Sequence, residues 1–363
     1  MPQKTRSRRW QLLSILIVLV LASSFGVKAQ TLERSLDIAY YVDDMAWSPD
    51  GTLIAVSGSD GIWVYTATLE PRAHFQQDRT RYAASVSWSP DSARLATVGN
   101  GAILVWQRST DDNFTLETSF SLDGYLQVLV AWSPDGTLLA SQDMPDLEDP
   151  WGVVSRIHLW NTTSWALERT IADADYRPGM LVWNASSTQL ATTTDFSRNT
   201  LLIDVANGQQ VAVFPDVEAP SALDWSVDNL LSVGGGTYLT TRSADDGHIL
   251  STFLYPQLQN VRELAWSPDG TRLLIYEDFL GAGVLDFATG QRIGTFPNAY
   301  ELTWSPDGKT VAAAGVNLNN NSNTLNACDV SQLSVDESLP TWTPYPTFVP
   351  RSTSTSAPSN SGN

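Results

Sequence analysis

The sequence predicts an all-β fold, a seven-bladed β-propeller of four-stranded antiparallel blades that is closed by an N-terminal strand. Seven tryptophans stand about 43 residues apart on average, and each ends a short apolar stretch. Most of them open a Trp-Ser-Pro-Asp-Gly turn or a close variant of it. A period of about 40–45 residues with strand-like contents is typical of one propeller blade, so seven repeats predict seven blades. The repeated residues are Trp47, Trp88, Trp132, Trp183, Trp225, Trp266 and Trp304.

The first repeat indicates how one blade is built. Met45 and Trp47 are two residues apart and therefore lie on one face of the first strand. A tight turn follows, because Pro49 fixes its own backbone angle and Gly51 accepts a positive one. Apolar runs and turn residues then predict four strands in this repeat, at residues 44–47, 53–56, 62–65 and 72–75.

The residues around each repeated tryptophan predict how blades pack. The position two before it is always apolar, and the position one before it is mostly small. This pattern favours a strand with large side chains on one face and a close neighbour on the other. We therefore expect the seven tryptophans to pack between blades, where a large ring contributes most by burial.

The last repeat predicts how the ring closes. It has strand candidates through residues 325–330 but no clear fourth strand, whereas residues 32–36 form an unassigned strand candidate before the first blade. Pairing this N-terminal strand with the last blade would close the ring and leave no open edge there.

Outside the repeats, both ends of the chain differ in composition. Basic residues and an apolar run precede a small-x-small pattern at residues 27–29, which predicts a signal peptide over residues 1–29. The propeller is expected over residues 30–335, and the Thr/Pro/Ser-rich residues 336–363 are expected to form a disordered tail. The protein is thus expected to be secreted or extracytoplasmic, in a periplasm or at a cell surface, without stable membrane insertion after cleavage. An uncleaved N-terminal anchor is the alternative.

Charge and cysteine content restrict the partners. The formal net charge is −18, and removal of the signal would make it more negative, so nucleic acid is excluded as a favourable partner. One cysteine, Cys328, rules out disulfides within the chain and a cysteine metal cluster.

The third strands resemble a known family. Residues 103–107 and 157–161, followed in other repeats by turns such as residues 206–208 and 288–290, resemble WD40 repeats over roughly residues 31 to 332. The chain departs from that pattern because it has no intact Trp-Asp dipeptide and lacks the usual Gly-His pair. The Trp-Ser-Pro-Asp-Gly turn also occurs in TolB-like propellers, which remain the second choice. The resemblance implies a fold that commonly supports protein or peptide recognition, and the style of the repeats suggests a bacterium.

Motifs for catalysis, cofactors or metals are scarce. The sequence has no nucleophile elbow, zinc-protease motif, phosphate loop or dinucleotide fingerprint. His74, His158 and His248 are far apart, and a calcium site at the acidic cluster of residues 143–149 lacks the alternating spacing of a calcium loop. We expect no catalytic residues, no metal and no cofactor.

Blade topology predicts where a binding surface lies. In a meander, the first and third turns open on one face of the disc, and the second turn and the inter-blade link open on the other. Irregular loops and aromatic links gather on this second face, and loops on a rigid scaffold often carry function. The candidate binding residues there are Tyr41, Tyr82, Tyr125, Trp151, Tyr176, Arg177, Tyr255 and Tyr300. The alternative is that these side chains cap the ring and pack locally.

The leading function hypothesis is an exported, non-catalytic scaffold that binds a protein or peptide of unidentified sequence through this face. One alternative is an enzyme or small-ligand propeller that uses Asp44, Glu263 and Glu301, each three residues before its tryptophan, near the central channel. For these carboxylates, solvated rim charges are the expected state. A TolB-like envelope component is the other alternative. Oligomeric state and biological process are not predicted.

Overall fold

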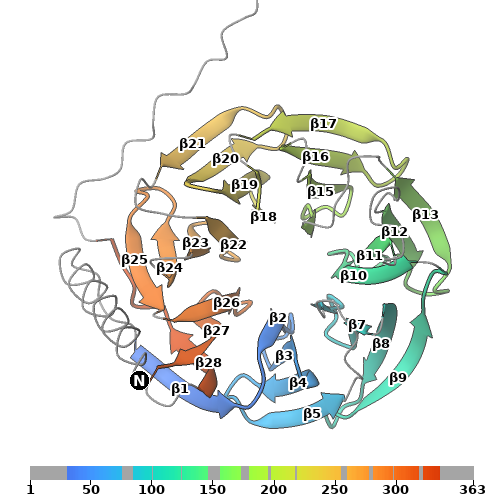
Figure 1. Cartoon of the computed structure of the whole chain (residues 1–363), viewed down its shortest axis with the longest axis horizontal. Coiled ribbons are helices and arrows are strands. Elements are labelled where there is room, and N and C mark those ends of the chain that lie inside the picture. The colour runs from blue at the N-terminus through green and yellow to red at the C-terminus, as the bar shows by residue number, and fades with distance from the viewer. Residues whose placement is uncertain are drawn as a thin grey trace, which may run out of the picture.

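Seven sheets of four strands form a closed ring in the computed structural model of the chain (Figure 1). The structure describes residues 31–75, 85–99, 101–123, 125–145, 156–172, 180–194, 198–216, 219–254, 260–277, 281–296, 298–318 and 322–335. Every sheet is antiparallel, and the strands follow one another from the centre of the ring outward. The predicted seven-bladed propeller is confirmed.

Blades one to three contain strands β2 to β13. Their bounds are β2 (Val42–Trp47), β3 (Leu53–Gly58), β4 (Gly61–Thr66) and β5 (Pro71–Phe75) in blade one; β6 (Val86–Trp88), β7 (Arg94–Gly99), β8 (Ala102–Arg108) and β9 (Phe114–Phe120) in blade two; β10 (Tyr125–Trp132), β11 (Leu138–Pro145), β12 (Arg156–Asn161) and β13 (Leu167–Ala172) in blade three.

Blades four to seven contain the remaining strands. Their bounds are β14 (Leu181–Trp183), β15 (Gln189–Thr194), β16 (Asn199–Asp204) and β17 (Gln210–Pro215) in blade four; β18 (Ala222–Trp225), β19 (Leu230–Gly235), β20 (Tyr238–Ser243) and β21 (Ile249–Leu254) in blade five; β22 (Val261–Trp266), β23 (Arg272–Glu277), β24 (Gly281–Asp286) and β25 (Arg292–Phe296) in blade six; β26 (Ala299–Trp304), β27 (Thr310–Asn317), β28 (Ser322–Asp329) and the N-terminal β1 (Thr31–Ile38) in blade seven.

The ring closes through the pairing of the first and last strands. β1 runs antiparallel to β28, with Thr31 opposite Asp329 and Ile38 opposite Asn323. The N-terminal strand therefore supplies the outermost strand of the last blade, as the sequence predicted (Figure 1). This pairing gives the edge of β28 a partner and leaves no gap in the ring.

The hydrophobic core is divided among the seven junctions between neighbouring blades. Each of the seven buried apolar clusters combines side chains of two adjacent blades, and each includes one repeated tryptophan. These seven side chains are only 5–9% exposed. The Trp88 indole also donates a hydrogen bond of 3.1 Å to the carbonyl oxygen of Ala46 in the preceding blade. The residue before the tryptophan is mostly small, and Ala46 packs at the junction with the next blade, where its size leaves room for this approach.

Within the described residues, no helix is long and apolar enough to cross a membrane. The predicted signal peptide, residues 1–29, and the predicted Thr/Pro/Ser-rich tail, residues 336–363, lie outside the described residues.

Candidate functional site

Hydrogen bonds between turns define the two faces of the disc. On one face, the Ala67 amide donates to the carbonyl oxygen of Thr52, so the third turn of blade one lies against its first turn. On the other face, the Ser59 amide donates to the carbonyl oxygen of Tyr41, so the second turn lies against the inter-blade link. We call these the turn face and the loop face.

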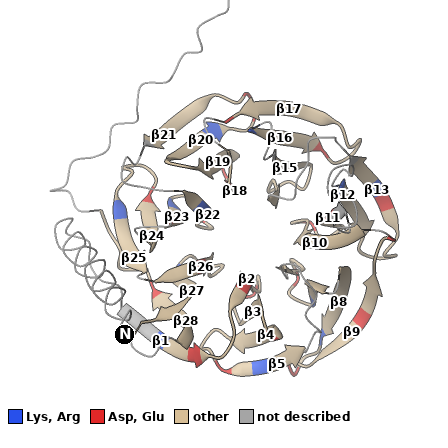
Figure 2. Ribbon diagram, in the orientation of Figure 1, with Lys and Arg blue, Asp and Glu red and all other residues tan. Residues whose placement is uncertain are grey.

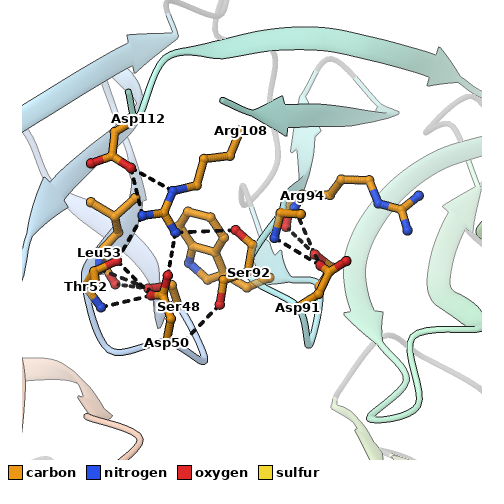
Figure 3. Close-up of polar contacts among 12 residues, drawn as sticks. Ser48, Asp50, Thr52, Leu53, Asp91, Ser92, Arg94, Arg108 and Asp112 are labelled. Atoms are coloured by element: carbon orange, nitrogen blue, oxygen red, sulfur yellow. Dashed lines mark hydrogen bonds and ion pairs between the residues drawn. The ribbon is translucent and has the colours of Figure 1, made fainter. Parts of the chain in front are cut away.

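The acidic turns on the turn face are internally bonded. Ser48 donates a hydrogen bond of 2.6 Å to Oδ1 of Asp50, and the same oxygen accepts the Thr52 amide and hydroxyl (Figure 3). Arg108 from blade two reaches Oδ2 of Asp50 at 2.8 Å. Burial opposes ionisation of Asp50, but the hydrogen bonds outweigh it and lower its pKa to about 2. Both carboxylate oxygens of Asp50 therefore form bonds within the protein that hold this turn together.

On the loop face, Tyr41 and Tyr300 form a stacked pair across the junction of blades seven and one. Their ring centroids lie 4.7 Å apart, and the rings are parallel to within 1°. Tyr300 accepts a hydrogen bond from the Val42 amide, and Ser59 accepts one from the Tyr41 amide, so both residues are anchored. Gly58 permits the close approach of the link, because a Cβ there would collide with the Tyr41 carbonyl.

Tyr125, the third candidate within the described residues, lies apart from this pair in blade three. Its ring covers the Arg156 guanidinium, whose carbon lies 3.3 Å from the ring centroid. Arg156 also donates to the buried Asp143 carboxylate at 2.8 Å. The five other candidates lie outside the described residues; they are Tyr82, Trp151, Tyr176, Arg177 and Tyr255.

Sequence reasoning missed the polar network behind Tyr125. The side chains of Asp143 and His158 are almost fully buried, and Nε2 of His158 lies 2.7 Å from Oδ2 of Asp143. The other ring nitrogen of His158 bonds the Thr170 hydroxyl at 3.0 Å, which links three strands of blade three. Asp143, which the sequence grouped with a possible calcium cluster, instead binds Arg156 and His158. His158 and Trp160 are two residues apart in β12, so their side chains lie on the same face of the strand. This spacing was the sequence signal that could have predicted a buried His158.

Among the residues that the structure describes, β-bulges shape the innermost strands of four blades at an equivalent position. The register shifts four residues before the tryptophan, at Asp43, Val128, Arg262 and Tyr300. A bulge redirects the side chains that follow it. In blades one, six and seven the following residue is a carboxylate, namely Asp44, Glu263 and Glu301.

These three residues, which we call the axial cluster, come from consecutive blades around the centre of the ring. Figure 2 shows acidic residues on the innermost strand β2. Asp44 accepts the Val86 amide of the next blade at 2.9 Å, and Glu263 accepts the Leu302 amide of the next blade at 3.2 Å. The carboxyl groups of Glu263 and Glu301 lie close enough that each affects the pKa of the other.

Burial raises the pKa of every member of the axial cluster. The pKa of Asp44 rises to about 6 despite hydrogen bonds that favour its charge, and that of Glu263 rises to about 8. Burial and repulsion from Glu263 raise the pKa of Glu301 well above its usual value. The three side chains are half-buried, and Asp44 and Glu263 accept amides of neighbouring blades, so the expectation of solvated rim charges holds only in part.

Comparison with known proteins agrees with this architecture. The family model described as WD domain, G-beta repeat matches residues 31–64 and 70–107. Each matched segment starts with the outermost strand of one blade, β1 or β5, and continues into the inner strands of the next. No curated protein matches the chain. The remaining blades repeat the same four-stranded order. Two segments of the chain thus match the WD40 repeat model, and the described residues form a seven-bladed β-propeller.

Proposed function

We propose that this propeller is an exported, non-catalytic scaffold that binds a protein or peptide through its loop face. WD40 propellers are commonly protein-binding scaffolds, and this general role follows from the family. The finer assignment rests chiefly on the tyrosine pair. Tyr41 is 51% exposed although Tyr300 covers one side of its ring. Exposed tyrosine held on a rigid framework is typical of recognition hot spots.

Tyr125 supports the same choice of face. Its ring is half-buried over Arg156, and Arg156 is in turn fixed by the buried Asp143. An aromatic ring and an arginine that are already ordered lose little conformational entropy when a partner binds them. The Tyr41–Tyr300 pair and Tyr125 all lie beside inter-blade links, and this supports a contact on the links and second turns of the loop face.

A capture experiment tests the proposed face. The mature chain would be immobilised and exposed to envelope and medium extracts of its source, with retained proteins identified by mass spectrometry. The combined Tyr41→Ser and Tyr125→Ser variant should lose a partner that the wild type retains. Val227→Ser is the matched control, because Val227 is 55% exposed on a turn-face loop. Equal retention by both variants would refute the choice of face.

Export is part of this proposal and has its own test. The basic, then apolar composition of residues 1–29 supports a cleaved signal. Expression of the full chain in a secreting host, followed by N-terminal sequencing, should find Gln30 as the first residue. An intact Met1 on membrane-associated protein would instead support an uncleaved anchor.

The axial cluster favours a second candidate function, in which carboxylates at the ring centre bind or transform a small ligand. Two neighbouring carboxyl groups with raised pKa values are an arrangement suited to acid–base chemistry. A TolB-like envelope role would share the scaffold mechanism and differ in partner. Loss of partner capture in Glu263→Gln, with capture unaffected by the tyrosine variants, would favour the ring centre over the loop face.

A further inference from the structure

The tyrosine pair offers one open aromatic face in a fixed position. Tyr300 covers one side of the Tyr41 ring at 4.7 Å, and the side chain of Tyr41 still exposes 51% of its surface. Among the described residues, Tyr300 is the one aromatic residue stacked on the Tyr41 ring, which leaves the opposite side of the ring as the candidate open face. Anchoring of Tyr41 by Ser59 and of Tyr300 by Val42 means that this face is already ordered before a partner arrives.

Two carboxyl groups, those of Asp43 and Glu301, influence this pair of tyrosines. Burial raises the pKa of both phenols, and the charges of Asp43 and Glu301 raise it further, to about 12 for Tyr300. Asp43 is exposed on the bulge of β2, and Glu301 follows Tyr300 in β26. The face of an aromatic ring is itself electronegative and attracts cations. Ring and carboxylates together therefore favour a positively charged group.

Blade three contains the same combination with its cation in place. There the Arg156 guanidinium lies over the Tyr125 ring and donates to the Asp143 carboxylate. A planar guanidinium can stack on a ring and bond a carboxylate at the same time, which an ammonium group does less well. Among the described residues, no arginine or lysine occupies the corresponding position over Tyr41.

We propose that the open face of Tyr41 is a subsite for an arginine side chain of the protein or peptide partner, stacked on the ring beside Glu301 and Asp43. This inference rests on the proposed function and specifies the partner's chemistry. It makes the partner segment basic where it meets blades seven and one. The strongly acidic composition of the chain would assist the approach of such a segment.

Proton release should accompany binding at this subsite. In the free protein, burial and the nearby carboxyl groups of Glu263, Asp44 and Asp43 keep the pKa of Glu301 well above its usual value. A guanidinium nearby stabilises the carboxylate form, so binding shifts Glu301 toward ionisation. Affinity for the arginine side chain should therefore rise with pH. Lysine would show the same sign with a weaker stacking contribution.

Titration with two capped tripeptides tests the subsite directly. Acetyl-Gly-Arg-Gly-amide and its citrulline counterpart have similar shapes, and only the first is charged. Binding to the full mature chain would be followed by NMR at pH 6 and pH 8. The arginine peptide should bind at least about tenfold more tightly, a difference of about 1.4 kcal/mol, and more tightly at the higher pH. Equal binding of the two peptides would overturn the proposal.

Four variants test which residues bind the arginine tripeptide. Tyr41→Ala should weaken arginine-peptide binding about tenfold, whereas Tyr41→Phe should retain it because the ring remains. Glu301→Gln should weaken binding and reduce its pH dependence. Leu318→Ser is the control, since Leu318 is 54% exposed on another loop of the same face and blade. Unchanged binding by Tyr41→Ala at normal folding stability would overturn the proposal.

The capture experiment separates this inference from the proposed function. If Tyr41→Ser loses the captured partner while the two tripeptides bind alike, the scaffold role stands and the arginine subsite is wrong. If the arginine peptide binds at Tyr41 while capture survives the tyrosine variants, the subsite stands and the proposed docking face is wrong.

Discussion

Arg242 of blade five donates a hydrogen bond of 3.0 Å to Asp216, which directly follows the outermost strand of blade four. Both side chains are almost fully buried, and Thr200 donates a second bond to the same carboxylate. Burial raises the pKa of Asp216 to about 6, even though Arg242 attracts its charged form. Burial of this ion pair therefore costs solvation free energy. The pair is also one of the polar contacts between neighbouring blades.

Removal of Arg242 alone should destabilise the protein strongly. Arg242→Ala would leave the Asp216 carboxylate buried without its cation, so we expect a loss of about 3–5 kcal/mol in unfolding free energy. The measurement is urea denaturation followed by tryptophan fluorescence. The double variant Arg242→Met with Asp216→Asn should recover much of the loss. Arg72→Ala, which breaks an exposed pair with Glu70, should change stability by less than about 1 kcal/mol.

The repeated indole should dominate each blade junction. Trp88→Ala would remove a ring that is 5% exposed, and we expect it to cost about 3–5 kcal/mol. Trp88→Phe keeps an aromatic ring but loses volume and the hydrogen bond to Ala46, so it should cost less. Calorimetric melting of both variants checks this order. A Trp88→Ala protein that melts like the wild type would contradict the assignment of the core to the blade junctions.

Stability should fall as pH rises, because the axial cluster has raised pKa values. Burial raises the pKa of Glu263 from its usual value of 4.5 to about 8 in the folded chain. An acid with a raised folded pKa contributes its full stabilisation below the unfolded pKa, and this is lost as pH rises through the folded value. The denaturation midpoint should therefore decline between about pH 4.5 and about pH 8.

A neutral variant isolates the part of this slope that comes from the cluster. Glu301→Gln removes one acid from the pair and should flatten the decline, with the largest gain in stability near pH 8. Asp216, Asp224 and Glu277 also have raised pKa values, so some slope should remain. An unchanged pH profile in Glu301→Gln would show that the pair does not control it.

Loss of the N-terminal strand should open the ring. Deletion of residues 31–37 removes the partner of β28 and the contact of Leu36 with the junction of blades seven and one. The exposed edge and the lost burial should lower the melting temperature sharply. Adding the strand back as a separate peptide should restore part of the loss, and an unchanged melting temperature would rule out this closure.

Much of the fold was predictable, because the repeat is carried by local patterns. Apolar strands, the Pro49–Gly51 type of turn and the spacing of the tryptophans each act within a few residues. The closure by β1 followed from counting strands. The spaced tryptophan and its apolar strand recur in every blade, although the Pro-Asp-Gly turn does not, so a worn copy such as the one at Trp183 could still be placed by its neighbours.

The candidate site was less predictable, because it depends on register and on contacts between blades. Asp44, Glu263 and Glu301 share a position relative to their tryptophans, and this signal was visible in the sequence. Their burial was not, because it depends on the bulges at Asp43, Arg262 and Tyr300. The Tyr41–Tyr300 stack joins the two ends of the repeat array, a relationship that no local pattern contains.

The opposition of Thr31 and Asp329 determines how the ring responds to force. The chain enters and leaves the circle at the same point, on neighbouring antiparallel strands. Tension applied between the two ends would therefore load one backbone hydrogen bond at a time and peel β1 from β28 like a zipper. A force applied between the two ends would therefore open the ring at low force. A force applied between one end and an interior loop would have to shear a whole blade.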